Sequence, residues 1–110
     1  MEAKLVELVK RVKERAGISI DSRDNYIKGI VEGVINELID INGIRDLDIE
    51  KRISDFMLVV DYSEWRYSSR GEGGFYEYRA FNSDGANVMP QSLAWRIRNR
   101  RLMVGRFANE

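Results

Sequence analysis

The hydrophobic positions of the chain fall into helical groups that are separated by glycines and polar residues. From Glu2 to Arg15, apolar side chains recur at three- and four-residue spacing among charges, which is typical of an amphipathic helix. These apolar residues are Leu5, Leu8, Val9 and Val12. Gly17 is expected to end this first helix.

A second helix is predicted from Ser22 to Ile41, with Asp21 or Ser22 as its N-terminal cap. Its apolar residues come as adjacent pairs every four residues, which makes a wide stripe. The pairs are Tyr26 and Ile27, Ile30 and Val31, Val34 and Ile35, and Leu38 and Ile39. A stripe of this width predicts neighbours on more than one side, and Asn42-Gly43 predicts a left-handed helix stop.

Gly29 and Gly33 lie four residues apart within this second helix. Each would cost about 1 kcal/mol relative to alanine in an exposed helix. The pair therefore indicates either a close approach of another backbone or a tolerated weakness.

A third helix is predicted to be capped by Asp46 or Asp48 and to run to about Ser69, with apolar residues on most of its sides. Asp61 lies among apolar neighbours, where an unpaired charge is costly, so we expect it to pair with an arginine, Arg96 being the first choice. If that pair is buried, removal of Arg96 should cost about 3 kcal/mol. The end of this helix should pack on the last helix. The residues expected to meet there are Val59, Val60, Tyr62 and Trp65 on one side and Leu93, Trp95 or Ile97 on the other.

Residues 70–89 form a long glycine-rich loop in this interpretation, and FYEYRAF within it alternates as a short hairpin strand would. Pro90 is well suited to the start of a last helix, which should reach about Arg101 and leave residues 102–110 as a C-terminal tail. The predicted fold class is all-α, a small bundle of about four helices in a single domain over residues 1–110.

Composition narrows the function classes. The chain has 110 residues, 44% hydrophobic and 33% charged, with 18 basic and 18 acidic side chains, so its overall charge favours neither nucleic acid nor membrane. Without cysteine or histidine it has no thiol nucleophile, disulfide or thiolate metal site. The longest apolar run, residues 56–60, is too short to cross a bilayer, and the N-terminus lacks a signal-peptide pattern.

No motif predicts catalysis, a cofactor or a metal. Asp46, Asp48 and Glu50 alternate as in a calcium loop but lack the glycine and the spacing of an EF-hand, so helix capping is favoured. The run Gly71-Glu72-Gly73-Gly74 lacks the lysine and hydroxyl residue of a phosphate-binding loop, and a helix stop is the favoured interpretation. We therefore expect a protein that is not an enzyme.

Arginines and aromatics gather in the second half of the chain. Residues 90–106 contain five arginines and no acid. Such a segment could bind phosphates while neighbouring rings stack on bases, or it could bind an acidic protein surface, since arginine and aromatic residues are enriched in interfaces. The absence of lysine after Lys51 tilts the choice toward protein contacts.

Two stretches resemble one known family. The order L-V-V-D-Y-x-x-W-R-Y-x-x-R over residues 58–70, followed after a loop by M-P-x-x-L-x-W-R-I-x-N over residues 89–99, is similar to the head–tail connector proteins of long-tailed bacteriophages and prophages, also called adaptor or head-completion proteins. Residues 71–88 are longer and more aromatic than the linker of that pattern, which leaves the role of this loop open. The structural signature comprises Asp61, Tyr62, Trp65, Pro90, Leu93, Trp95 and Arg96.

The resemblance implies a structural virion assembly protein without catalytic residues. Many copies, typically about twelve, would form a ring that joins the portal of the head to the next connector or tail protein and continues the DNA channel, with weak non-specific DNA contact. It would act at the head–tail interface of the virion after assembly in the cytoplasm of the bacterial host. The portal-facing residues implied are Arg98, Arg100, Arg101, Arg106 and Phe107. The residues implied for a subunit interface or loop hinge are Arg66, Tyr67, Arg70, Gly71, Gly73 and Gly74. The alternative is a small nucleic-acid-binding module that uses the arginine-rich C-terminal segment.

Overall fold

The computed structural model describes residues 2–70 and 89–106, with the backbone alone for Arg70. Its elements are α1 (Glu2–Ala16), α2 (Asp24–Asn36), the π-helix η1 (Glu37–Ile41), α3 (Ile53–Arg70) and α5 (Gln91–Leu102). These ranges contain no strand, so the all-α prediction is confirmed. The predicted hairpin and the glycines at 71, 73 and 74 lie outside the described residues.

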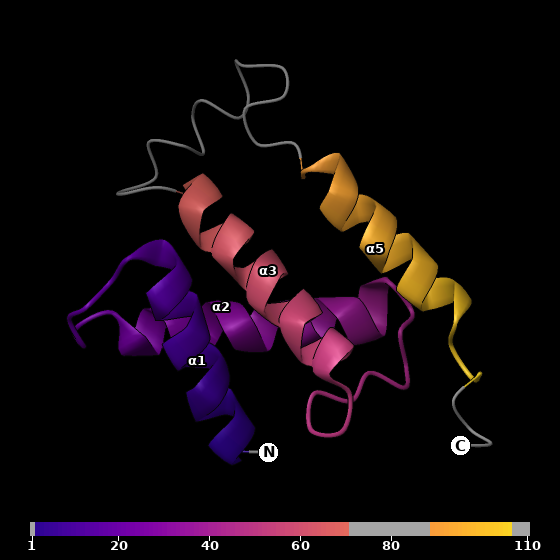
Figure 1. Cartoon of the computed structure of the whole chain (residues 1–110), viewed down its shortest axis with the longest axis horizontal. Coiled ribbons are helices and arrows are strands. Elements are labelled where there is room, and N and C mark those ends of the chain that lie inside the picture. Colours follow the sequence, from indigo (N-terminus) through magenta and orange to yellow (C-terminus); the bar gives the residue numbers. More distant parts are fainter. Residues whose placement is uncertain (1, 71–88, 107–110) are drawn as a thin grey trace.

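Three helices form the body of the molecule and the fourth lies along one of them. α1, α2 and α3 pack against each other pairwise, with α1 and α3 lying across α2 (Figure 1). The shortest dimension is 19 Å, which is about two helix diameters of ~10 Å and fits this two-layer arrangement. α5 packs on α3, on the side away from α1, and runs antiparallel to it (Figure 1).

The core follows the predicted apolar pattern. All four apolar residues singled out on α1 are buried, and so are Ile27, Ile30, Val31, Val34 and Ile35 of α2. Val59 and Val60 of α3 are completely buried between its neighbours. The wide stripe of α2 is explained by its two partners, because α1 and α3 both rest on it.

The second predicted helix ends where expected, but its last turn is a π-helix. The amide of Asn42 donates to the carbonyl of Glu37 at 3.0 Å, five residues back, and the amide of Ile44 donates to the carbonyl of Leu38 at 2.9 Å. Gly43 has φ +75°, so the predicted left-handed stop is confirmed. The wider π turn rotates the residues after it away from the α-helical stripe, and Ile41 is 77% exposed.

Both predicted N-terminal caps are wrong. α2 begins at Asp24 after Arg23, which makes no side-chain cap bond, while the Asp21 carboxylate accepts a hydrogen bond from Lys13 at 2.8 Å. α3 begins at Ile53, later than predicted. Asp48 instead closes a single turn, since its carboxylate accepts the amides of Glu50 and Lys51 at 3.0 Å each.

Gly29 and Gly33 do not mark a close approach within the chain. A Cβ built on either one meets no atom within 4 Å, and both residues are exposed. Within the described residues the tolerated weakness is therefore the right interpretation of the two.

Replacing Gly33 by alanine should raise the free energy of unfolding by about 0.5–1 kcal/mol, because alanine loses less backbone entropy in a helix and meets nothing there. Gly43→Ala should lower it by about 1 kcal/mol, because L residues rarely adopt φ +75°. Urea denaturation followed by circular dichroism measures both. Equal effects of the two substitutions would contradict this account of the helix end.

Candidate partner interface

The inner side of α5 combines two apolar residues with two arginines. Leu93 and Ile97 are 5% and 7% exposed and pack in the core cluster with α3. Arg96 and Arg100 follow at the spacing that places all four residues on one face of a helix. α5 is therefore attached to α3 by apolar packing and by charge on the same side.

The predicted pairing of Asp61 with Arg96 is confirmed. Arg96 donates from Nη1 to Oδ2 of Asp61 at 2.6 Å, and Arg15 of α1 donates to the other carboxylate oxygen at 2.8 Å. The carboxylate thus joins α1, α3 and α5. Its side chain is 25% exposed and that of Arg96 is 37% exposed, so this pair is half-buried and should contribute less than a buried one.

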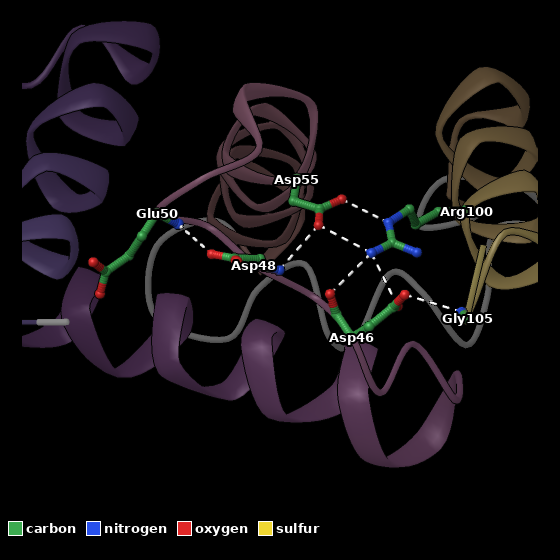
Figure 2. A network of polar contacts seen from close by, with 6 residues as sticks. All are labelled: Asp46, Asp48, Glu50, Asp55, Arg100 and Gly105. Carbon is green, nitrogen blue, oxygen red and sulfur yellow. Dashed lines mark hydrogen bonds and ion pairs between the residues drawn. The ribbon is translucent and has the colours of Figure 1, made fainter. Parts of the chain in front are cut away.

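A second pair, which the sequence analysis missed, is the buried one. Arg100 donates from Nε and Nη2 to the two carboxylate oxygens of Asp55 at 2.7 and 3.1 Å (Figure 2). The two side chains are 8% and 1% exposed. Arg100 Nη2 also donates to the backbone carbonyl of Asp46 and lies 3.0 Å from its carboxylate. A bidentate arginine–carboxylate contact fixes orientation as well as distance.

The same network includes the chain after α5. The amide of Gly105 donates to Oδ2 of Asp46, and the amide of Asp48 donates to Oδ2 of Asp55, each at 3.0 Å (Figure 2). The end of α5, the 46–48 turn and the start of α3 are therefore linked through one guanidinium.

The charges of this network shift two pKa values. Partial burial alone would raise the pKa of Asp46, but the Gly105 amide and the Arg100 charge outweigh it and hold the pKa below its usual value. Burial alone would lower the pKa of Arg100, but Asp55 and Asp46 outweigh it and raise the pKa above its usual value. Both directions favour the charged network.

The outer side of α5 carries an exposed mixture of apolar and basic residues. Trp95 and Leu102 are 60% and 63% exposed, and Arg98 lies between them on the same helical face. Of the three residues expected to pack against α3, Leu93 and Ile97 do so, and Trp95 points outward. We call Trp95, Arg98 and Leu102 the α5 outer stripe.

A groove of about 300 Å³ borders this outer stripe, between η1, α3 and α5. Ile41, Ala94 and Ile97 give it an apolar lining, and Arg98 and Arg101 add positive charge. Glu37 also lines the groove, but its carboxylate lies 2.6 Å from Nη2 of Arg66. The groove and the stripe together form an apolar and cationic surface.

Some of the remaining predicted site residues are exposed, and others are bonded to neighbours within the chain. Arg101 and Arg106 are exposed, whereas Arg100 is engaged within the chain. Arg66 donates to the hydroxyl of Tyr62, and Tyr67 accepts a hydrogen bond from Arg23 and packs edge-on against Tyr26. Their assignment to a subunit interface stays a prediction.

Other predicted site residues have structural roles or lie outside the described residues. Tyr62 is buried and its ring lies 6.0 Å from that of the half-buried Trp65, while Pro90 is the residue before the first turn of α5. Phe107 lies outside the described residues, as does the side chain of Arg70.

A cluster of metal-binding side chains and a membrane-spanning helix are both absent from the described ranges. Residues 2–70 and 89–106 contain no group of three or more acidic side chains placed to hold a metal ion. Among the same residues, no helix has the length and hydropathy needed to cross a bilayer.

Comparisons with protein-family models, with curated proteins and with solved structures found no match.

Removal of the buried arginine should destabilise the protein more than removal of the half-buried one. We expect Arg100→Ala to lower the free energy of unfolding by about 3–5 kcal/mol, because Asp55 would remain buried without its partner. We expect Arg96→Ala to cost about 1 kcal/mol, because Asp61 keeps Arg15 and reaches solvent. Chemical denaturation of both variants checks this order, and a larger loss for Arg96→Ala would contradict it.

Asp46 should add stability that disappears in acid. Because its folded pKa is lowered, the stabilisation is complete above the unfolded value of about 4 and is lost as the pH falls through the folded pKa. Asp46→Asn should therefore be less stable than the wild type at pH 7, and this difference should shrink as the pH falls below about 4 and through the folded pKa. A difference that stays constant across this range in urea denaturation would refute the assignment.

Proposed function

We propose that this protein is a structural head–tail connector, one of many copies that form a ring between the portal of a phage head and the next connector or tail protein. The two stretches that carry the sequence resemblance, residues 58–70 and 89–99, lie on α3 and α5, which pack together. Asp61 of the first stretch bonds Arg96 of the second. This contact supports the proposal, because it gives the charged residues of both patterns a shared structural role.

The two sides of α5 differ in burial and in bonding, and this difference carries the proposal. Its inner side holds both ion pairs and the buried apolar residues, while the α5 outer stripe leaves Trp95 and Leu102 in solvent. Tryptophan and arginine are the residues most enriched at the energetic centres of protein interfaces. We assign this stripe and its groove to portal docking.

The assignment refines the set of portal-facing arginines. Arg98, Arg101 and Arg106 are exposed and would meet acidic or carbonyl groups of the portal directly. Arg100 would act through position, because its pairing with Asp55 holds α5 at a fixed angle to α3. Phe107 keeps its assignment to the portal side as a prediction.

The test is native mass spectrometry of the protein mixed with the portal ring from the same source. We expect one copy of this chain per portal subunit. Trp95→Glu and Arg98→Glu should each abolish or strongly weaken the complex, since they change exposed residues and leave the core intact. Glu32→Lys, an exposed change on α2, is the matched control and should bind as the wild type does.

The nucleic-acid alternative gives a different outcome in the same experiment. Absence of a portal complex, together with tight oligonucleotide binding that weakens steeply with salt, would overturn the connector proposal. Portal binding that survives both stripe substitutions would reject the α5 outer stripe as the docking surface.

A further inference from the structure

The polar side chains on the inner wall of the groove beside α5 are bonded to each other. Tyr62 and Glu37 both line this groove. Arg66 donates from Nη2 to the Tyr62 hydroxyl at 3.0 Å, and the same nitrogen lies 2.6 Å from the carboxylate of Glu37. Glu37 is the one acid among the described lining residues, and its charge is therefore balanced within the chain.

The rim of the groove carries two arginines whose charges are not balanced in this way. Arg98 and Arg101 are exposed, and neither has an ion pair or a side-chain hydrogen bond with a residue of the described ranges. They lie three residues apart on α5, a spacing that brings Cβ atoms within about 5–6 Å. The aliphatic part of Arg101 lies over Gly43, where a Cβ would be 3.9 Å from its Cδ. Asp40, the exposed acid of η1, does not line the groove, so the rim is positive.

The floor of the groove is aliphatic and open to solvent. Ile41 is 77% exposed, and Met89, Ala94 and Ile97 line the groove with it. The lining on α5 extends from Ala94 to Arg101, which is about 10 Å along the helix axis at 1.5 Å per residue. With a volume of about 300 Å³, the groove suits the side chains of a short segment.

We propose that this groove binds a short segment of the portal-side partner in which carboxylates flank large apolar side chains. The apolar side chains would cover Ile41 and Ala94, and the carboxylates would meet Arg98 and Arg101 in charge-assisted hydrogen bonds. The α5 outer stripe of a second copy does not fit, because it would bring a further Arg98 toward these two arginines. The identity of the partner rests on the proposed connector function, whose docked segment is specified here by its chemistry.

Nucleic acid fits the groove less well than an acidic protein segment does. Phosphates would gain from the two rim arginines, but sequence-tolerant binding of single strands also uses accessible rings on which bases stack. Tyr62 is the aromatic residue among the described lining residues, and it is only 3% exposed. Trp95 is exposed but does not line the groove. The aliphatic floor therefore favours apolar side chains over bases.

The probes are three synthetic peptides of about twelve residues, long enough to span the groove as a helix or as an extended chain. The first combines leucines with flanking glutamates. The second has serine in place of each leucine, and the third has lysine in place of each glutamate. Backbone amide shifts of the full-length protein, recorded during titration, give both the affinity and the surface that is bound. We expect only the leucine–glutamate peptide to bind, with shifts in η1 and α5.

The variants change the rim and the floor separately at exposed positions. Arg98→Glu combined with Arg101→Glu should weaken binding of the leucine–glutamate peptide about tenfold, because two exposed charge pairs are lost, and should give the leucine–lysine peptide measurable affinity. Ile41→Ser should also weaken binding, because it removes apolar surface from the floor. Lys10→Glu combined with Arg11→Glu is the matched control, since it changes the net charge equally at two exposed positions of α1 and should leave the affinity unchanged.

Several results would overturn the proposal. These are the absence of leucine–glutamate peptide binding, equal binding of its serine analogue, and an affinity that charge reversal at the rim does not alter. An oligonucleotide that shifts the same amides at a lower concentration than the peptide would assign the groove to nucleic acid. Shifts of these amides on dilution of the protein alone would assign it to a second copy.

Portal binding distinguishes failure of this inference from failure of the connector proposal. Peptide binding at the groove without a portal complex would support the chemistry of the groove and remove the portal as its partner. A portal complex that the variant with both Arg98→Glu and Arg101→Glu forms as tightly as the wild type would overturn the inference and leave the connector proposal in place.

Discussion

The placement of α5 depends on the bidentate contact between Arg100 and Asp55. α5 packs on α3 and lies away from α1, so its apolar attachment is limited to a narrow inner face. A buried guanidinium that contacts both oxygens of one carboxylate adds the angular definition that two apolar residues do not give. Since the desolvation of both charges offsets much of their attraction, we regard the pair as specifying an orientation more than adding stability.

The half-buried pair of Asp61 with Arg96 complements this contact. It lies further along α3, and Arg15 extends it to α1. Together the two carboxylates fix α5 at two points of α3, in antiparallel order, because Asp55 precedes Asp61 whereas its partner Arg100 follows Arg96. The outward direction of Trp95 and Leu102 is a geometric result of these two inward arginines.

Much of the fold could be predicted from the sequence, because its apolar periodicity is strong. The four helices, their buried faces and the glycine stop after η1 all follow from spacing, and Asp61 was identified because a carboxylate in an apolar stretch needs a partner. The same reasoning applies to Asp55, which directly precedes Phe56, but the sequence analysis did not single it out; in the structure it lies in the first turn of α3 and is buried. The start of α3 was misplaced because Asp48 has the chemistry of a cap and closes a short turn instead. Trp95 was expected as one possible contact of α3 but is exposed, because the sequence pattern alone does not distinguish a buried tryptophan from an exposed one.

The π turn at the end of α2 affects the shape of the groove beside α5. An α-helix that continued the stripe of Ile27, Val31, Val34 and Leu38 would carry Ile41 on its buried side. The hydrogen bond from Asn42 to Glu37 accommodates one additional residue in the turn, and Ile41 lines a surface groove instead. The shape of that surface is therefore determined by the number of residues in one helical turn, so a single-residue deletion there could reshape it while hydrophobic composition stayed nearly constant.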